Sequence, residues 1–307
     1  MSQDPVGTVT SSAALPQGFL RKSLNSRSEV LLIAVEARAL LQCQMERIHA
    51  DPSAMIHLGQ AMMSALLLQA LGDTSENDRV QCEWMVNGPF GNLYAESLGT
   101  GRVRGTIGSP QAGPAALGQP LGEGLFQVRR HHSGALSTGM INSTGRVSTD
   151  LVDFLERSEQ RACGSNLSVK IEYDEARAEA GYANPFFVKS AHAFLIHVLP
   201  QESDAKRDEV LRSWDAQIRV LGPISQWKLS EDSATATQEM IQMLSMQQDI
   251  PSIFGNEIEL YCTCSEERAA RALALVEANT SPGEEIPSEA PTVRCEFCGS
   301  VYRIGSA

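Results

Sequence analysis

Cys262-Thr263-Cys264, followed after thirty residues by Cys295-Glu296-Phe297-Cys298, carries the clearest structural signal in this chain of 307 residues. Thiolate is a soft ligand, and four thiolates in a tetrahedral arrangement suit Zn²⁺. The stretch offers few apolar residues from which to build a core, so a bound metal would supply much of its folding free energy. We therefore predict that residues 259–307 form a small zinc-binding domain with Cys262, Cys264, Cys295 and Cys298 as ligands.

The spacing of these cysteines leaves their role open. They could form a purely structural zinc module, or a redox switch, because zinc-bound thiolates react with oxidants and their oxidation releases the metal. A nucleic-acid-binding zinc ribbon is disfavoured, because residues 262–307 contain four Arg, no Lys and seven Glu and would repel phosphate. A thiol–disulfide oxidoreductase that uses Cys295 and Cys298 would need a thioredoxin-like βαβ context, and the flanking sequence does not offer one.

The composition of the chain narrows its function class. Hydrophobic residues make up 42% and charged residues 20%, which indicates a folded protein with a real core. The net charge of −12 argues against general binding to nucleic acid or anionic membranes. The apolar run at residues 61–71 is shorter than the roughly 20 residues that a membrane-spanning helix needs. Residues 1–17 lack the basic and apolar regions of a secretory signal, so we expect a disordered tail and a cytoplasmic protein with mostly reduced thiols.

Three further cysteines, Cys43, Cys82 and Cys163, are isolated from the C-terminal group. No Cys-His-Asn order that would indicate a nucleophilic thiol enzyme accompanies any of them. Single cysteines of this kind are more often small apolar core residues. We therefore expect buried, structural thiols at all three positions.

Residues 18–200 are predicted to form one α+β domain. Strand-like runs separated by glycines occupy residues 80–189, and an apolar run at residues 186–199 should return to the core. Helices are expected at residues 38–49, 53–71 and 148–160. Asp51 can cap the second helix, and Pro52 suits its first turn. Strands in runs with a few helices between them favour an α+β fold over an alternating α/β fold.

Residues 201–258 are interpreted as two helices, with no strand before Asn256. Their apolar residues are Leu211, Trp214 and Ile218 in the first helix and Met240, Met243, Leu244 and Met246 in the second. Two short amphipathic helices cannot form a substantial core by themselves, so these faces need a partner. They could pack on the preceding domain, or the Met-rich stretch could serve as an adaptable surface for client proteins, and both interpretations stay open.

Several motifs occur together with the cysteines. The specific ones are Cys262-Thr263-Cys264-Ser265, Val293-Arg294-Cys295-Glu296-Phe297-Cys298 and Tyr302, and weaker ones are Gly88-Pro89-Phe90-Gly91, Gly101-Arg102-Val103-Arg104-Gly105 and Ser158-Glu159-Gln160. In order and spacing they resemble the heat-shock protein 33 family of redox-regulated holdase chaperones. The resemblance extends over most of the chain, and the C-x-C and C-x-x-C pairs are its most specific part.

The resemblance implies a substrate-binding and dimerisation domain at residues 18–200, a metastable helical linker at 201–258 and a zinc redox-switch domain at 259–307. It implies one zinc ion per reduced chain and no enzymatic activity. On oxidation, disulfides Cys262–Cys264 and Cys295–Cys298 would form, zinc would leave, and the linker would loosen.

The chain, monomeric when reduced, would then form a homodimer and bind unfolding client proteins without ATP under oxidative stress. Neither nucleic acid nor membrane is expected as a partner. A thiol–disulfide oxidoreductase and a constitutive binding module with structural zinc remain the alternatives.

Overall fold

The computed structural model describes residues 17–25, 29–72, 75–99, 101–182, 184–245, 250–279 and 291–304. The predicted disordered tail, except for Gln17, and Met246 lie outside the described residues. In chain order the elements are β1 (Gly18–Leu24), β2 (Val30–Glu36), α1 (Arg38–Ile48), α2 (Pro52–Ala70), β3 (Arg79–Val86), β4 (Leu93–Leu98), β5 (Arg102–Ile107), β6 (Gly124–His132), β7 (Ala135–Ser143), α3 (Val147–Arg157), β8 (Cys163–Tyr173), α4 (Glu175–Glu179), β9 (Phe186–Val198), α5 (Asp204–Leu221), α6 (Ser233–Leu244), β10 (Ser252–Leu260), α7 (Glu266–Asn279), β11 (Thr292–Arg294) and β12 (Val301–Arg303).

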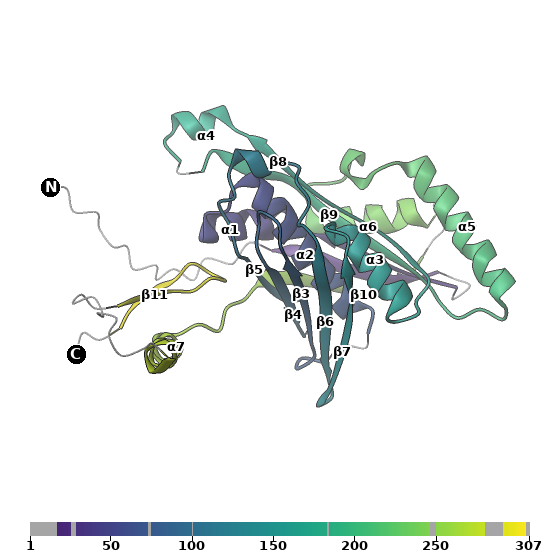
Figure 1. Cartoon of the computed structure of the whole chain (residues 1–307). Helices are drawn as coiled ribbons and strands as arrows, with labels where there is room; N and C mark the ends of the chain where they lie inside the picture. Colours follow the sequence, from purple (N-terminus) through teal and green to yellow (C-terminus); the bar gives the residue numbers. More distant parts are fainter. Residues whose placement is uncertain are drawn as a thin grey trace.

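A ten-stranded sheet forms the centre of the molecule, in the order β7-β6-β3-β4-β5-β10-β1-β2-β9-β8 (Figure 1). Consecutive strands pair as antiparallel hairpins in both halves of the sheet, and helices cover its faces. The predicted α+β fold is therefore confirmed. β11 and β12 form a separate two-stranded sheet, which lies with α7 at one end of the molecule, while α5 lies at the other end.

Helix α2 packs against strands of both halves of the sheet. The Asp51 carboxylate accepts a hydrogen bond of 2.8 Å from the Ala54 amide, and Pro52 opens the helix, as the sequence predicted. Nearly every side chain of α2 is buried, since the helix is apolar all round. Ile33 of β2 and Leu93 of β4 belong with α2 to one cluster of buried side chains, so one continuous core underlies both halves of the sheet.

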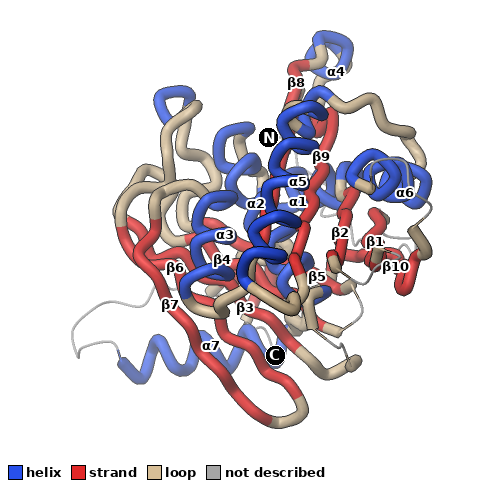
Figure 2. The backbone as a smooth tube through the Cα atoms, turned by 90° about the vertical axis from the view of Figure 1, so that its right-hand side faces the viewer, coloured by secondary structure: helices blue, strands red, loops and turns tan. Residues whose placement is uncertain are grey.

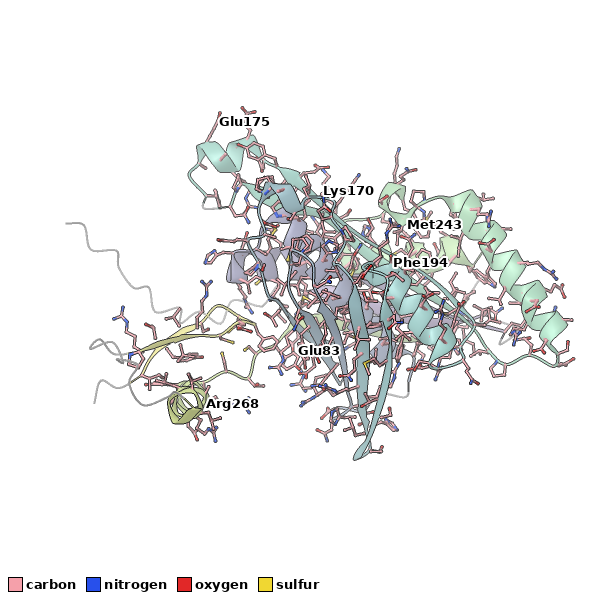
Figure 3. The ribbon with its side chains drawn as sticks, viewed as in Figure 1. Glu83, Lys170, Glu175, Phe194, Met243 and Arg268 are labelled. Atoms are coloured by element: carbon pink, nitrogen blue, oxygen red, sulfur yellow. The ribbon has the colours of Figure 1, made fainter. Side chains whose placement is uncertain are left out.

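Helices α5 and α6 cover the opposite face of the sheet, over β2 and β9. Alternate residues of a strand point to opposite faces, so Ile33 enters the core with α2 while Leu32 enters a second cluster with α5 and α6. In that cluster Trp227 stacks on Phe194 of β9 with ring centroids 5.6 Å apart. Figure 3 labels Phe194 and Met243 where α6 meets the sheet. The two helices expected between residues 201 and 258 are confirmed.

The expectation that residues 201–256 contain no strand is wrong. Residues Ser252–Leu260 form β10, which pairs antiparallel with β1 and lies beside it in the middle of the sheet (Figure 2). The segment escaped recognition because Gly255, Asn256 and two glutamates interrupt its apolar pattern, and only Ile258 and Leu260 are buried. Its strand conformation comes from pairing with a partner more than 200 residues away in the chain.

Within the described parts of the chain, no helix combines the length and the apolar character that crossing a membrane requires.

Candidate metal centre

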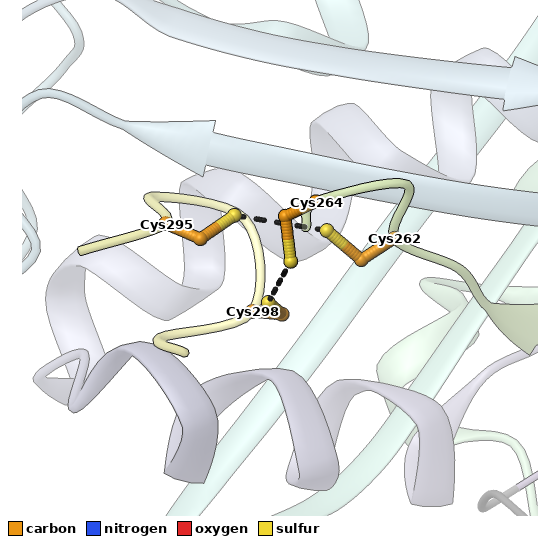
Figure 4. Close-up of side chains that lie close together, drawn as sticks. All are labelled: Cys262, Cys264, Cys295 and Cys298. Atoms are coloured by element: carbon orange, nitrogen blue, oxygen red, sulfur yellow. Dashed lines mark hydrogen bonds between the residues drawn. The ribbon is translucent and has the colours of Figure 1, made fainter. Parts of the chain in front are cut away.

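The four C-terminal cysteines meet at one point, although they come from two separate segments. Cys262 and Cys264 follow the end of β10, and Cys295 and Cys298 lie in the turn that joins β11 to β12. All four Sγ atoms lie within 4.8 Å of one another (Figure 4). Cys262 Sγ is 3.6 Å from Cys295 Sγ, and Cys264 Sγ is 3.3 Å from Cys298 Sγ. Each offers one sulfur, so the cluster could hold a metal ion.

Local backbone geometry explains why these sulfurs converge. The Gly299 amide donates to the Cys295 carbonyl and the Cys295 amide to the Ser300 carbonyl, both at 2.8 Å, which closes a tight turn around the second pair. Ser265 caps the start of α7 by accepting a hydrogen bond of 3.3 Å from the Arg268 amide. The first pair is thus held between the end of a strand and the start of a helix.

The electrostatics of the cluster fit a cation. Burial raises the pKa of the Cys262 thiol, and burial also raises the pKa of Cys295. Burial opposes ionisation of Cys298 too, but hydrogen bonding to Ser300 and to the neighbouring thiols brings its pKa down to about 7. Four adjacent thiolates repel one another at neutral pH unless a positive charge sits among them. A soft divalent cation therefore matches both the donor atoms and the charge of this site.

Two hydroxyl groups flank the sulfurs. The Tyr302 hydroxyl donates a hydrogen bond of 3.0 Å to Cys264 Sγ, and Ser300 Oγ lies 3.2 Å from Cys298 Sγ. Groups of this kind orient metal ligands and tune their reactivity. Tyr302 belongs to the motif that the sequence analysis singled out, but Ser300 carries no sequence signal beyond its place after the last ligand.

The cysteine module, residues 261–279 and 291–304, docks on the sheet through Arg104 of β5. The Arg104 guanidinium lies 4.4 Å from the centroid of the Phe297 ring and 5.1 Å from that of Tyr261. Phe297 stands between the cysteines of the second pair, and Tyr261 directly precedes the first. One arginine therefore contacts both ligand-bearing segments. The Phe297 carbonyl also accepts from the Gln44 side chain of α1 at 3.0 Å.

A buried carboxylate holds Arg104 in this position. Glu96 is 1% exposed and lies 3.0 Å from the Arg104 guanidinium. It also accepts hydrogen bonds from the hydroxyl groups of Tyr94, at 2.8 Å, and of Tyr261. Burial alone would raise the pKa of Glu96, but hydrogen bonds from Tyr261 and Gln81 lower it, so the carboxylate stays charged. Sequence reasoning missed this network, because nothing in the strand pattern marks Glu96 as buried.

Close backbone packing completes the docking. Gly299 has a φ of +73°, and a Cβ atom there would lie 2.2 Å from the Arg47 carbonyl oxygen at the end of α1. Only glycine therefore fits between the turn that carries Cys295 and Cys298 and the helix.

The candidate client-binding residues lie in the cluster between the linker helices and the sheet. Met240 and Leu244 are fully buried, and Trp214 is 8% exposed. Leu211, Ile218 and Met243 are partly buried against the same cluster. In this structure these residues therefore pack on the preceding domain, which is one of the two interpretations that the sequence left open.

The isolated cysteines are spread over the α+β domain. Cys82 and Cys163 are buried, and burial raises the pKa of each thiol to about 12. Cys43 is only half-buried, so the expectation of burial holds fully for two of the three.

Comparison with known proteins gives a consistent result. The family model described as "Hsp33 protein" matches residues 19–305. The "33 kDa chaperonin" of Symbiobacterium thermophilum is 25% identical, and the alignment covers 93% of each chain. That of Aquifex aeolicus is 27% identical, over 84% of this chain and 78% of the relative. The crystal structure of the 33 kDa chaperonin from Thermotoga maritima, at 18% identity, superposes with a TM-score of 0.70 over 93% of both chains, so the two share a fold.

Proposed function

Because the chain belongs to the Hsp33 protein family, we propose that it is an ATP-independent chaperone that oxidation of a four-cysteine zinc centre activates. It would bind unfolding proteins under oxidative stress and keep them from aggregating. Its relatives are named 33 kDa chaperonins, which supports the chaperone part of the proposal. We place it in the cytoplasm, where thiols stay reduced until an oxidant appears.

The continuity of the chain from α6 to the metal centre carries the proposal. Helix α6 precedes β10 in the chain, and Tyr261 and Cys262 follow β10 directly. Loss of order at the cysteines therefore acts directly on β10 and on the linker helices before it. A marginally stable segment is released when the unit that anchors it loses its own stability.

In the reduced state, Cys262, Cys264, Cys295 and Cys298 would hold one zinc ion per chain. Zinc would supply the free energy that keeps this small module folded. The linker, residues 201–258, would then stay docked on the sheet, and the chain would remain monomeric. The domain boundaries 18–200, 201–258 and 259–307 are part of this proposal.

Oxidation would convert the four thiolates into two disulfides, Cys262–Cys264 and Cys295–Cys298. Each disulfide forms as two thiolates give two electrons to one molecule of hydrogen peroxide, which takes up two protons and becomes two water molecules. Two peroxide molecules thus oxidise one chain. A disulfide sulfur is a poor zinc ligand, so the metal leaves and the module loses its main source of stability.

Release of the linker would uncover apolar surface on the sheet and on the linker helices. Leu32 and Phe194 would become accessible on the sheet, and Trp214, Met240 and Leu244 on the helices. Contiguous exposed apolar surfaces bind unfolded segments or a second copy of the chain. We therefore propose client binding and homodimer formation in the oxidised state.

Light scattering from an aggregating client protein tests the proposal. The full chain is added either reduced and zinc-loaded, or after treatment with peroxide at elevated temperature. We expect only the oxidised sample to suppress aggregation, and size-exclusion chromatography should show a dimer only in that sample. Equal suppression by both samples would indicate a constitutive chaperone with structural zinc, and suppression by neither would remove the chaperone function.

The ligand assignment has its own test. Cys295→Ser should lower the zinc content and uncouple activity from peroxide, whereas Cys82→Ser, at a buried cysteine far from the cluster in sequence, should keep zinc binding. A Cys295→Ser chain that binds zinc as tightly as the parent and still responds to peroxide would contradict the assignment. Turnover in an insulin-reduction assay would instead support a thiol–disulfide oxidoreductase.

A further inference from the structure

β10 occupies the middle of the sheet, yet it is buried like an edge strand. Of its nine residues only Ile258 and Leu260 are buried, whereas all seven residues of β2 are. Its hydrogen bonds to β5 are confined to one end, where the Glu259 and Tyr261 amides donate to Gly101 and Val103. A central strand that is covered on both faces, as β2 is, normally has a near-continuous run of apolar residues. β10 therefore leaves its place with little loss of apolar burial.

The space between β10 and the C-terminal end of α2 is incompletely filled. A cavity of about 250 Å³ lies there, lined among others by Leu20, Leu66, Gln69, Ser97, Phe254 and Asn256. Gln69 Oε1 and Ser97 Oγ are buried, and neither has a hydrogen-bond partner among the described residues. Buried polar atoms without partners destabilise the folded state. β10 thus covers this part of the core without fitting it well.

The cysteine module anchors the C-terminal end of β10. Tyr261, the residue after β10, stacks on Arg104 and donates a hydrogen bond to Glu96. The next residue, Cys262, is one of the four clustered cysteines. A change at the cysteines therefore acts first on the end of β10 that carries its two buried side chains.

We propose that the edge of β1, once β10 has left it, binds an extended segment of an unfolding polypeptide, which adds to the sheet as a strand between β1 and β5. The inference rests on the proposed function, because oxidation of the cysteine module is what frees β10. The occupant follows from the site: a strand sits there in this structure, and its two buried side chains, Ile258 and Leu260, are apolar and alternate along it. The bound segment is therefore extended and apolar at alternate positions.

The register of β10 defines the hydrogen bonds that a client strand would make. The Glu259 amide points to β5, so the amides of Phe254, Asn256 and Ile258 point to β1, because alternate amides face opposite edges. These residues pair with Lys22, Leu20 and Gly18 in turn. A client strand would replace these three contacts along β1.

A peptide with the sequence of residues 250–260 of this chain, labelled with fluorescein, serves as the probe. It is titrated into the full chain, either reduced and zinc-loaded or oxidised, and fluorescence anisotropy reports binding. The oxidised chain should bind it at least about tenfold more tightly than the reduced chain. Equal affinity for both states, or no binding to an oxidised chain that suppresses client aggregation, would overturn the proposal.

Methylation of the peptide amides separates strand addition from binding through side chains alone. A peptide methylated at the amides of residues 254, 256 and 258 should lose binding, because these amides face β1. A matched peptide methylated at residues 253, 255 and 257 should keep most of it. Equal behaviour of the two methylated peptides would contradict strand addition to β1.

A cross-link gives a second test. Phe19 pairs with Glu257 at a position where neither amide faces the other strand, so Phe19→Cys/Glu257→Cys should form a disulfide that fixes β10 to β1. Oxidised and cross-linked, the chain should still release zinc but lose peptide binding and most aggregation suppression. The control Arg129→Cys/Thr138→Cys links the neighbouring strands β6 and β7 and should change neither.

The outcomes separate the two proposals. If the parent chain suppresses aggregation only when oxidised but the cross-linked chain does so equally well, strand addition at β1 is wrong and the proposed function stands. If the oxidised parent chain suppresses no aggregation, the proposed function fails, whatever the peptide does.

Discussion

Arg104 contacts the aromatic residues beside both cysteine pairs, and Glu96 fixes its position. A planar guanidinium stacks on an aromatic ring in a way that an ammonium group does not. Arg104 thus connects the metal centre to β5 through contacts that need both ligand segments to be in place.

Arg104→Lys keeps a positive charge beside Glu96 but removes the stacking on Phe297 and Tyr261. We expect zinc content to stay the same, while docking of the cysteine module weakens by about 1 kcal/mol. Hydrogen exchange of residues 291–304 in the zinc-loaded chain measures this. Arg102→Lys is the control, because Arg102 is exposed and its guanidinium lies farther from the Tyr261 ring centroid, at 6.0 Å, than that of Arg104, at 5.1 Å. The same change in exchange for both variants would contradict the role of Arg104.

The thiol groups predict how zinc binding depends on pH. Burial raises the pKa of Cys262 and Cys295, and zinc must displace the protons of these thiols before it binds. The apparent zinc affinity should therefore rise with pH from about pH 6 to pH 8. Competition with a chromophoric chelator at several pH values measures it, and an affinity independent of pH would argue against thiolate ligation.

At the scale of elements, α6 docks on a buried carboxyl group. The Ser233 hydroxyl at the start of α6 donates to Glu36 at the end of β2, and the Arg38 side chain donates to the Glu231 carbonyl at 3.2 Å. Burial raises the pKa of Glu36 above its ordinary value of 4.5. Folding therefore favours the protonated carboxyl group.

The contribution of Glu36 to stability is fully present below the ordinary glutamate pKa and is lost as pH rises through the raised value in the folded chain. Glu36→Gln removes the titration. In urea unfolding followed by tryptophan fluorescence, its stability relative to the parent chain should increase from pH 5 to pH 7.5. A difference that is the same at both pH values would show that Glu36 does not titrate in this way.

Trp227 joins the linker to the sheet through an aromatic contact. It stacks on Phe194, and its indole N–H donates to the Leu221 and Gly222 carbonyls. Trp227→Ala should destabilise linker docking by roughly 3–5 kcal/mol, the usual cost of such a truncation. The reduced, zinc-loaded variant should then suppress client aggregation without peroxide.

The control for Trp227→Ala is Val220→Ala on α5, since Val220 is 82% exposed. It should behave as the parent chain. A Trp227→Ala chain that folds, stays inactive when reduced and gains activity only with peroxide would show that linker docking is not what holds the chaperone inactive.

The elements differ in how well the sequence predicts them. α2 was recognisable because Asp51, Pro52 and a long apolar run mark it locally. β10 was not, since its conformation depends on pairing with β1 near the other end of the chain. Isolated strands have little stability of their own. The sequence of β10, with two glutamates and a glycine, therefore predicts a loop unless its pairing with β1 is known.

At the scale of the whole molecule, the sequence identified the four cysteines but not the surface on which the cysteine module docks. The spacing of the cysteines was enough to predict that they meet, because the C-x-C and C-x-x-C pairs of a metal site are recognisable in short stretches of sequence. The docking surface was hidden, because Gln44, Glu96 and Arg104 come from three elements whose proximity only the fold creates. The order of the strands was equally hidden, and it is this order that places the weakly packed β10 between β5 and β1.

We propose that the metal centre holds the linker and β10 in place until oxidation. The most direct test is a peroxide time course in which released zinc and suppression of client light scattering are measured in the same sample. Zinc release and suppression should follow one rate, with no suppression before zinc leaves. Suppression by fully zinc-loaded chain, or complete loss of zinc with no gain in suppression, would contradict it.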